Sequence, residues 1–365
     1  MLIEQGVLRS AASYIRETLP AAKHFVVVTS EPIRKHWGKV LLDSFASCTS
    51  SSGTSSSNAA QVDVIEMPDG ERHKKLSTVE GLSNELVKLK SDRNTVLIAL
   101  GGGVVGDVTG FLASIYMRGI RFVQIPTTYL AQVDSSVGGK TGVNLRAGKN
   151  LVGCFKQPEL VLVDPHVLST LPEREYRSGL YESLKAGVIR NPRIFEFMEQ
   201  NREQVLAKEP GSLEWLIAES VRVKADVVGQ DEEEHGLRKI LNFGHTIGHA
   251  LEAETGYKVF LHGEAVAWGM VASAKIAAGM QKTSPEAAQR IVSLVRAYAP
   301  KNAPLPEVDV RPKAIFRRLA SDKKTLDGLV HFILPRGVGQ VDIVTDVPEG
   351  EVLRAVEELR SLSHA

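Results

Sequence analysis

The chain has 365 residues and a nearly balanced charge, with 44 lysines and arginines against 43 aspartates and glutamates. Its length is enough for two domains of ~100–200 residues each. The net charge of +1 argues against a general nucleic-acid binder and against a membrane-surface protein. It leaves room for a local basic pocket that takes a small anion.

The two cysteines, Cys48 and Cys154, form no C-x-x-C pattern, so we expect neither a zinc-ribbon site nor a disulfide framework. The first residues carry Glu4 and Arg9 and have no long apolar core, unlike a secretory signal. The most apolar stretch, residues 265–274, is too short to span a bilayer. These features predict a soluble, cytoplasmic protein.

The first half of the chain alternates short apolar runs with helical patterns such as residues 78–92. The runs are rich in β-branched residues and cover 25–30, 62–67, 95–100, 121–126 and 160–165. Continuous apolar strands that alternate with helices predict a parallel sheet covered on both faces. The Ser-rich stretch 48–61 predicts a flexible surface loop.

From about residue 171 the pattern becomes helical, with apolar residues three and four positions apart. The helical segments are 173–189, 211–229, 239–256 and 263–280; two strands, 329–335 and 340–346, and a last helix from Glu349 follow. We therefore predict an α/β domain with a mainly parallel, Rossmann-like sheet over 1–171 and a mainly α-helical domain over 172–365. A cleft between them is the expected site.

A glycine-rich turn follows the third predicted strand. Gly101, Gly103 and Gly106 match G-x-G-x-x-G between a strand and a helix, which favours binding of a dinucleotide pyrophosphate. The alternative is a tight turn with glycines for packing alone. The acidic residue expected ~20 positions later is missing, so a dinucleotide would be held differently from the usual Rossmann scheme.

A second near-motif is "DSSVGGKTGVN", residues 134–144. Gly139, Lys140 and Thr141 fit the end of a P-loop, but Asp134 stands where the first glycine belongs. A carboxylate there opposes phosphate binding. Either Lys140 binds some other anion, or it is an exposed lysine after a turn.

Three of the ten histidines lie within 18 positions. His245 and His249 share one helical face, and His262 follows among small residues, a pattern that suits a metal site. Hydrogen-bonded histidines on a helix face are the alternative. A third ligand could be histidine or a carboxylate such as Glu182, which lies in an apolar helix and needs a partner.

The acidic run from Asp231 to Glu234 precedes Arg238, Asn242 and His245. It is either a solvated face or a source of one acid for the site.

Seven motifs in chain order, from about 67 to 270, resemble 3-dehydroquinate synthase. They are "MPDGERHK", "GGGVVGDVTGF", "MRGIRFVQIPTTYLAQVDSSVGGKTGVN", "GKNLVGCFKQP", "LYESLKAGVI", "DEEEHGLRKILNFGHTIGHALE" and "HGEAVAWGM". Other sugar-phosphate cyclases carry similar motifs. Glycerol dehydrogenases and iron-type alcohol dehydrogenases share the architecture more distantly.

The resemblance implies a dehydroquinate synthase-like fold and a lyase of the shikimate pathway. Such an enzyme converts 3-deoxy-D-arabino-heptulosonate 7-phosphate to 3-dehydroquinate and phosphate. The steps are transient oxidation by NAD, phosphate elimination, reduction and an intramolecular aldol closure. The resemblance also implies NAD, a divalent metal (Zn²⁺, with Co²⁺ possible), and a homodimer.

The family's site residues carry over by motif. The metal ligands fall on Glu182, His245 and His262, so that His249 becomes a catalytic residue. The other catalytic positions are Glu234, Lys140, Lys185 and Asp134. NAD-binding positions are Asp69, Gly70, Glu71, Lys74, Gly103, Val104, Val105, Gly106, Asp107, Thr127, Thr128, Lys140, Lys149 and Thr170. Substrate-binding positions are Asn150, Lys224, Arg238, Asn242, Lys324 in preference to Lys323, and Arg118, which would reach a neighbouring subunit's site.

Three other functions are weighed against this one. An NAD- and metal-dependent polyol dehydrogenase would have little need for a pocket of four basic residues. Another sugar-phosphate cyclase would need changes around Arg238 and Asn242. A non-catalytic scaffold would be expected to lose a metal ligand or Lys140, and all are present.

Overall fold

The structure is a computed structural model that describes residues 1–50, 60–232, 234, 236–299, 305–322 and 329–363. Its contacts divide the chain into two units. The first is Met1–Pro172 with Leu213–Ala218, and the second is Glu173–Ser212 with Glu219–Ala365. Lys323, Lys324 and the centre of the Ser-rich stretch lie outside the described residues.

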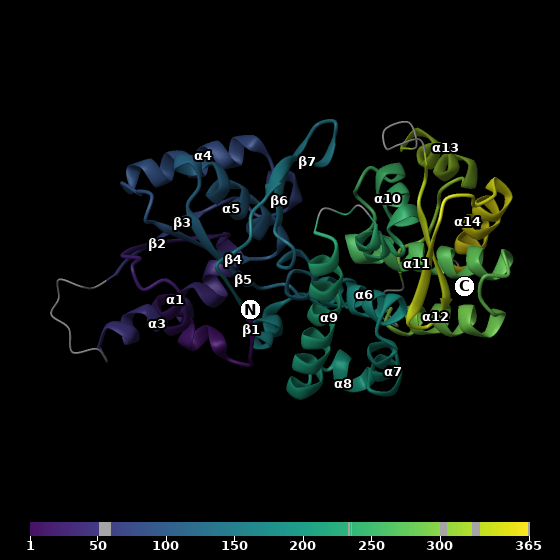
Figure 1. The fold of residues 1–365 in the computed structure, drawn as a ribbon, viewed down its shortest axis with the longest axis horizontal. Helices are drawn as coiled ribbons and strands as arrows, with labels where there is room; N and C mark the ends of the chain where they lie inside the picture. The colour runs from purple at the N-terminus through teal and green to yellow at the C-terminus, as the bar shows by residue number, and fades with distance from the viewer. Residues whose placement is uncertain (51–59, 233, 235, 300–304, 323–328, 364–365) are drawn as a thin grey trace. The chain divides into compact units, whose positions relative to one another are not determined.

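A six-stranded parallel sheet forms the first unit (Figure 1). Its strands, in the order β1-β8-β5-β4-β2-β3, are β1 (Leu2–Ile3), β8 (Leu160–Val163), β5 (Arg121–Pro126), β4 (Val96–Gly101), β2 (His24–Thr29) and β3 (Gln61–Glu66). The five apolar runs are therefore confirmed as strands of one parallel sheet. Strand β1 was not predicted, because two residues are too few to show a period.

Helices cover both faces of this sheet, as predicted (Figure 1). Alternate residues of β4 point to opposite faces of the sheet. Ile98 belongs to the core that packs under α1 (Ala11–Thr18) and α3 (Lys39–Ser50). Leu97 belongs to the core that packs under α4 (Leu76–Lys88) and α5 (Gly103–Ile115). The short helical turns of this unit are η1 (Val7–Ser10), α2 (Glu31–Ile33), η2 (Arg34–Gly38), η4 (Glu71–His73), η5 (Tyr116–Arg118), η6 (Ala131–Ser135) and η7 (Pro165–Thr170).

Two details differ from the sequence-based expectation. Helix α3 continues to Ser50, so residues 48–50 of the predicted loop are helical. An antiparallel hairpin, β6 (Lys140–Leu145) and β7 (Gly148–Phe155), was not predicted, and it contains the near-P-loop lysine.

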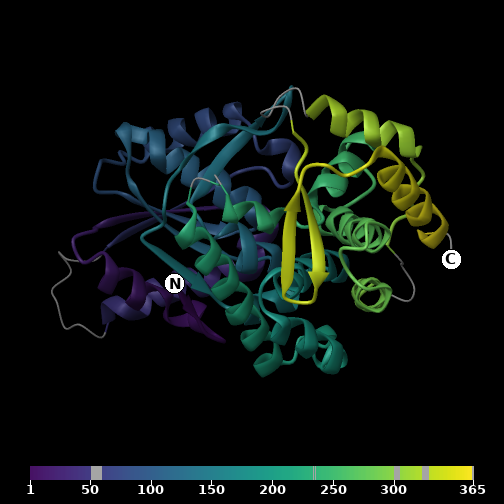
Figure 2. The ribbon, with the colours of Figure 1, turned by 45° about the vertical axis from the view of Figure 1, so that its right-hand side comes forward.

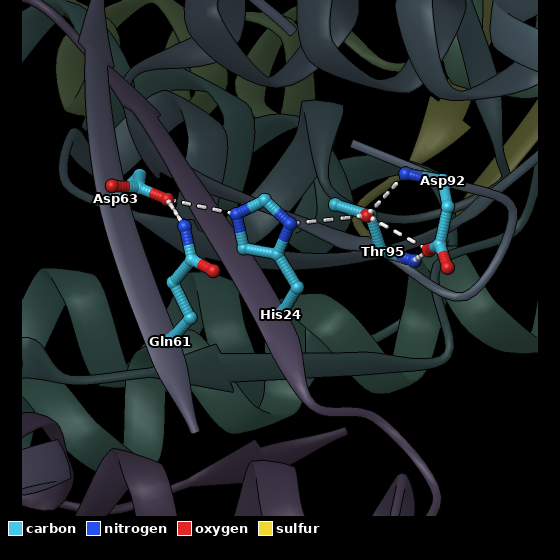
Figure 3. A network of polar contacts seen from close by, with 5 residues as sticks. All are labelled: His24, Gln61, Asp63, Asp92 and Thr95. Atoms are coloured by element: carbon cyan, nitrogen blue, oxygen red, sulfur yellow. Dashed lines mark hydrogen bonds and ion pairs between the residues drawn. The ribbon is translucent and has the colours of Figure 1, made fainter. Parts of the chain in front are cut away.

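A polar network joins the amino ends of β2, β3 and β4 (Figure 3). His24 Nε2 lies 2.8 Å from Asp63 Oδ2, and its Nδ1 lies 3.3 Å from Thr95 Oγ1. The Asn94 N–H, with further hydrogen bonds from Thr95, lowers the pKa of Asp92. Thr95 is fully buried, so its hydroxyl is closed to a substrate.

The second unit is predominantly helical. Its helical segments are α6 (Glu173–Ile189), α7 (Pro192–Gln200), α8 (Arg202–Leu206), α9 (Pro210–Gln230, with Leu213–Ala218 grouped in the first unit), η8 (Leu237–Asn242), α10 (His245–Glu254), α11 (His262–Gly279), α12 (Pro285–Ala297), α13 (Pro312–Asp322) and α14 (Glu349–Ser363). Strands β9 (Phe332–Gly337) and β10 (Gln340–Val344) pair as an antiparallel hairpin, yellow in Figure 2. Helices α6, α9, α11 and α14 and both strands were predicted, and the predicted helix 239–256 is divided into η8 and α10. Helices α7, α8, α12 and α13 were not predicted.

Helix α11 is the centre of this unit. Most of its residues are buried, and it packs against α6, α10, α12, α14 and β9. No helix in the described part of the chain is long and apolar enough to cross a membrane.

Candidate active site

One candidate site lies in the first unit, at the carboxyl ends of the parallel strands. Strand β2 pairs with β3 on one side and β4 on the other, so the order of the strands reverses there, and ligands bind outside the carboxyl ends at such a point. The glycine turn follows β4, and Asp69 follows β3. Helix α5 begins at Gly103, so its free N–H groups are available at this edge.

A small hollow lies beneath the glycine turn, lined in part by Gly101, Gly103, Gln124 and Ser136. Gln124 Oε1, Ser136 Oγ and the nearby Thr127 Oγ1 are buried and have no hydrogen-bond partner among the described residues. The glycines also serve packing, since a Cβ on Gly101 would lie 2.6 Å from Val105. The turn is therefore tightly packed, and it also has unsatisfied polar atoms that a ligand could engage. Its binding of a dinucleotide stays a prediction.

One hydrogen-bonded network connects several of the expected residues. The buried Lys74 places Nζ 2.5 Å from Asp107 Oδ2 and 2.5 Å from Asn150 Oδ1. Asn144 donates through Nδ2 to Glu71 Oε1 at 2.8 Å, and its Oδ1 accepts the N–H of Asn150 at 2.8 Å. Three expected cofactor residues and one expected substrate residue are thus connected through the side chains of Lys74 and Asn144.

Asn144 is a residue that sequence reasoning missed, although it ends the quoted motif "GGKTGVN". Its own N–H also donates to the carbonyl of Lys74 at 2.8 Å, so β6 is fixed against the segment that follows β3. A sequence shows that a residue is polar but does not show its partners.

The remaining expected residues of the first unit vary in exposure. Lys140 and Arg118 are exposed, Asp134, Lys149 and Thr128 are half-buried, and Val105 lies in the core, so that only its backbone can meet a ligand. Thr170 accepts a hydrogen bond from Trp37 Nε1 at 2.9 Å.

A second candidate site, in the second unit, is a cluster of imidazoles. The ring of His245 lies 5.2 Å from that of His249 and 5.2 Å from that of His262. One nitrogen from each of the three rings lies within 4.8 Å of the others, close enough to share one cation. Glu182 joins them from α6, with Oε1 3.8 Å from His245 Nε2.

Glycines allow these helices to touch. A Cβ on Gly263 would lie 1.9 Å from the carbonyl oxygen of Ser178, so α11 meets α6 backbone to backbone. Ser178 is one turn before Glu182, and Gly263 follows His262 directly. This contact therefore brings His262 towards Glu182.

A glycine also allows close contact between α10 and α11. A Cβ on Gly269 would lie 1.8 Å from the carbonyl oxygen of Gly244, which precedes His245 and has a φ of 82°. A side chain on Gly269 would push His245 away from His262.

Electrostatics keep His245 neutral. Burial, the positive Lys185 and the neighbouring imidazoles lower the pKa of His245 well below its usual value. Its Nδ1 lies 3.2 Å from the carbonyl oxygen of Phe243 and donates to it, which leaves the Nε2 lone pair for a cation.

The buried Glu182 fits a metal. Its carboxylate forms an ion pair with Lys185, and Oε1 has no hydrogen-bond partner among the described residues. Ligand atoms that each lie about 2 Å from a tetrahedral zinc ion are about 3.3 Å apart. The 3.8 Å from Oε1 to His245 Nε2 is near that spacing.

An arginine missed by the sequence analysis fixes the start of α11. Arg174 donates to both carboxylate oxygens of Glu264, each at 2.7 Å, and Glu264 accepts the N–H of Leu261 at 2.8 Å. The Glu264 hydrogen bond raises the pKa of Arg174. The pair links α6 to the end of α11 that carries His262.

The acidic run lies beside the other expected substrate residues. Asn242 Nδ2 donates to Glu234 Oε1 at 2.7 Å, and Asp231 Oδ2 accepts the N–H of Arg238 at 2.9 Å. The buried Arg238 guanidinium donates to the carbonyl of Glu232. Lys224 is half-buried on α9.

Two family models cover most of the chain. The 3-dehydroquinate synthase N-terminal model matches residues 64–178, and the 3-dehydroquinate synthase C-terminal model matches 179–325. The chain belongs to the 3-dehydroquinate synthase family. The resemblance drawn from the seven motifs is thereby confirmed.

Curated members of the 3-dehydroquinate synthase family match over the full length. The protein named 3-dehydroquinate synthase of Koribacter versatilis is 57% identical, covering 100% of this chain and 95% of that relative. The one of Solibacter usitatus is 45% identical, covering 97% of this chain and 94% of that relative.

Solved structures similar to this 3-dehydroquinate synthase family member include other cyclases. A 2-epi-5-epi-valiolone synthase of Streptomyces hygroscopicus, with NAD⁺ and Zn²⁺ bound, has a TM-score of 0.87 at 26% identity and covers 99% of this chain and 96% of its own. A 2-deoxy-scyllo-inosose synthase, complexed with carbaglucose-6-phosphate, NAD⁺ and Co²⁺, has a TM-score of 0.83 at 29% identity. The match covers 97% of this chain and 95% of that one. A probable glycerol dehydrogenase of Sinorhizobium meliloti, at 16% identity, shares the fold with a TM-score of 0.64.

Proposed function

We propose that this protein is a 3-dehydroquinate synthase that converts 3-deoxy-D-arabino-heptulosonate 7-phosphate to 3-dehydroquinate and phosphate, and is thus a carbon–oxygen lyase. One observation carries the proposal. A chain 57% identical over its whole length to a protein of that name also brings Glu182, His245, His249 and His262 together. The reaction needs a metal, a hydride acceptor and a pocket for an anion, and the residues for each are present.

Glu182, His245 and His262 would hold the divalent cation. The orphaned Glu182 Oε1 and the neutral His245 support this donor set. A divalent cation, when bound, supplies a Lewis acid that makes a substrate hydroxyl more acidic. Zinc suits a set of imidazole and carboxylate donors, and Co²⁺ can take the same geometry.

The glycine turn and the segment Asp69–Lys74 would hold the dinucleotide. The unpartnered Thr127 Oγ1 and the free N–H groups of α5 support a pyrophosphate site. Glu71, which accepts a hydrogen bond from Asn144, would bind a ribose in place of the missing Rossmann acid. NAD, when bound, supplies the reversible hydride acceptor.

Basic side chains would bind the two anionic ends of the substrate. Lys140, Lys185, Lys224 and Arg238 neutralise the phosphate and the carboxylate and hold them in a fixed orientation. Asn150 and Asn242 are short hydrogen-bonding side chains for sugar hydroxyls.

His249 and Glu234 would move protons. The His249 ring is the exposed member of the imidazole cluster and lies 5.2 Å from the ring of His245, so a substrate and water can reach it. Glu234 is oriented by Asn242 at 2.7 Å. Asp134 would orient a substrate hydroxyl or a lysine. The proposal includes a cytoplasmic homodimer in which the exposed Arg118 reaches the neighbouring subunit's site.

The deciding assay combines the purified protein, zinc, the heptulosonate phosphate and NAD in catalytic amount. We expect release of phosphate equal to the substrate consumed, with no accumulation of NADH. A polyol dehydrogenase would instead produce NADH in proportion to a simple polyol. Another cyclase would turn over a different sugar phosphate and leave this one untouched.

Two variants sharpen the assay. Lys140→Ala is expected to lower kcat/KM at least ~100-fold. The control Lys39→Ala removes an exposed lysine that is paired with Asp43, and it should leave kcat/KM unchanged. His262→Ala is expected to abolish turnover and leave zinc below one per chain. Full zinc occupancy in that variant would remove His262 from the ligand set.

A further inference from the structure

Glu252 is a buried carboxylate that the expected site residues do not include. It is 3% exposed and lies on α10, seven residues after His245 and three after His249. That spacing puts all three side chains on one face of the helix. Its Oε2 lies 3.3 Å from Nδ1 of His262, the first residue of α11.

We propose that Glu252 is a positioning residue that orients His262 for metal binding, an inference that rests on the proposed function. The carboxylate accepts the Nδ1–H of His262. This fixes the tautomer in which Nε2 carries the lone pair, and it holds the ring in one orientation. The negative charge also makes Nε2 a stronger donor.

The other proposed imidazole ligand is held in a comparable way. His245 Nδ1 lies 3.2 Å from the carbonyl oxygen of Phe243. Both rings therefore have an oxygen acceptor at Nδ1, so both would present Nε2 to the cation. The acceptors differ in one respect: Phe243 offers a neutral carbonyl oxygen and Glu252 a charged one, so Glu252 is the one that a substitution can test.

The geometry also explains why a carboxylate is buried here. A buried carboxylate is costly unless it is paired. A Glu252–His262 pair beside a cation places the negative charge near a positive one. A merely structural role would require Glu252 for folding but leave the affinity for zinc unchanged once the protein is folded.

The experiment measures zinc affinity in the full chain. Glu252→Gln and Glu252→Ala are compared with the wild type by competition with a chromophoric chelator, using zinc alone. We expect the dissociation constant to rise about 10–100-fold in the alanine variant and less in the glutamine variant, whose amide oxygen can still accept from Nδ1–H. The visible spectrum of the Co²⁺ form should change in parallel.

Glu254→Ala is the matched control. Glu254 lies on the same helix, partly exposed, with its carboxylate 3.0 Å from Arg318 Nε. We expect wild-type zinc affinity. If the alanine variant does not fold, zinc affinity can still be measured in Glu252→Gln, because glutamine has nearly the shape of glutamate.

The outcomes separate this inference from the proposed function. Wild-type zinc affinity in both Glu252 variants would overturn the role of Glu252 and leave the proposed function untouched. Weakened zinc binding in a protein that never releases phosphate would support Glu252 and reject the synthase. A wild-type chain that binds no zinc would overturn both.

Discussion

Replacement of Gly263 by alanine tests how the metal centre is assembled. The added Cβ would lie 1.9 Å from the carbonyl oxygen of Ser178, where real contacts do not fall below 3.0 Å, so α6 and α11 must separate by about 1 Å. Overpacking of this kind costs ~1–3 kcal/mol of the free energy of unfolding. The same shift moves His262 away from Glu182, and a misplacement of about 1 Å lowers turnover on the order of 100-fold.

The assay pairs urea unfolding with zinc affinity and steady-state rates for Gly263→Ala. Gly229→Ala is the control, because Gly229 lies in helix α9 and a Cβ there meets no atom within 4 Å. That variant should keep its activity and gain ~0.5–1 kcal/mol of stability. If Gly263→Ala binds zinc and turns over like the wild type, close contact of α6 and α11 does not position the ligands.

Three further predictions follow from other contacts. Asn144→Ala removes two side-chain hydrogen bonds, so the dissociation constant of NAD and the KM of the substrate should both rise on the order of 10-fold, measured by titration and initial rates. Asp164→Ala leaves the N–H groups of Gly6 and Leu8 without their acceptor and should cost at least ~2 kcal/mol in urea unfolding, unless both find water. In metal-free protein the native state keeps His245 neutral while the unfolded chain takes up a proton below pH 6.5. The free energy of unfolding of the metal-free protein should therefore fall as the pH drops below 6.5, by up to about 1.4 kcal/mol per pH unit. In His245→Gln this free energy should depend less on pH.

The sequence predicts the parallel sheet well because its strands are buried on both sides. Runs such as 95–100 are apolar without interruption, a pattern that few other structures share. The hairpin of β6 and β7 was missed for the opposite reason. Strand β6 has only two apolar side chains, Val143 and Leu145, which are too few to show a period of two.

The site is harder to predict than the sheet. Helical spacing alone places His245 and His249 on one face, but Glu182 and His262 come from other helices. Their approach depends on Gly263, which a sequence pattern treats only as a weak point in a helix. Asn144 and Glu252 were not predicted, because their roles depend on hydrogen-bond partners that only the folded structure brings close to them.

Three of the expected site residues have backbones that glycine would adopt more easily. Arg118, Asn150 and Glu234 have φ values of 68°, 55° and 67°. A left-handed conformation costs a residue with a side chain about 1 kcal/mol, least for asparagine. Glycine at any of these positions would relax the chain while deleting the functional group. Substitution by glycine at any of these three positions should therefore raise the thermal stability of the protein and lower its turnover.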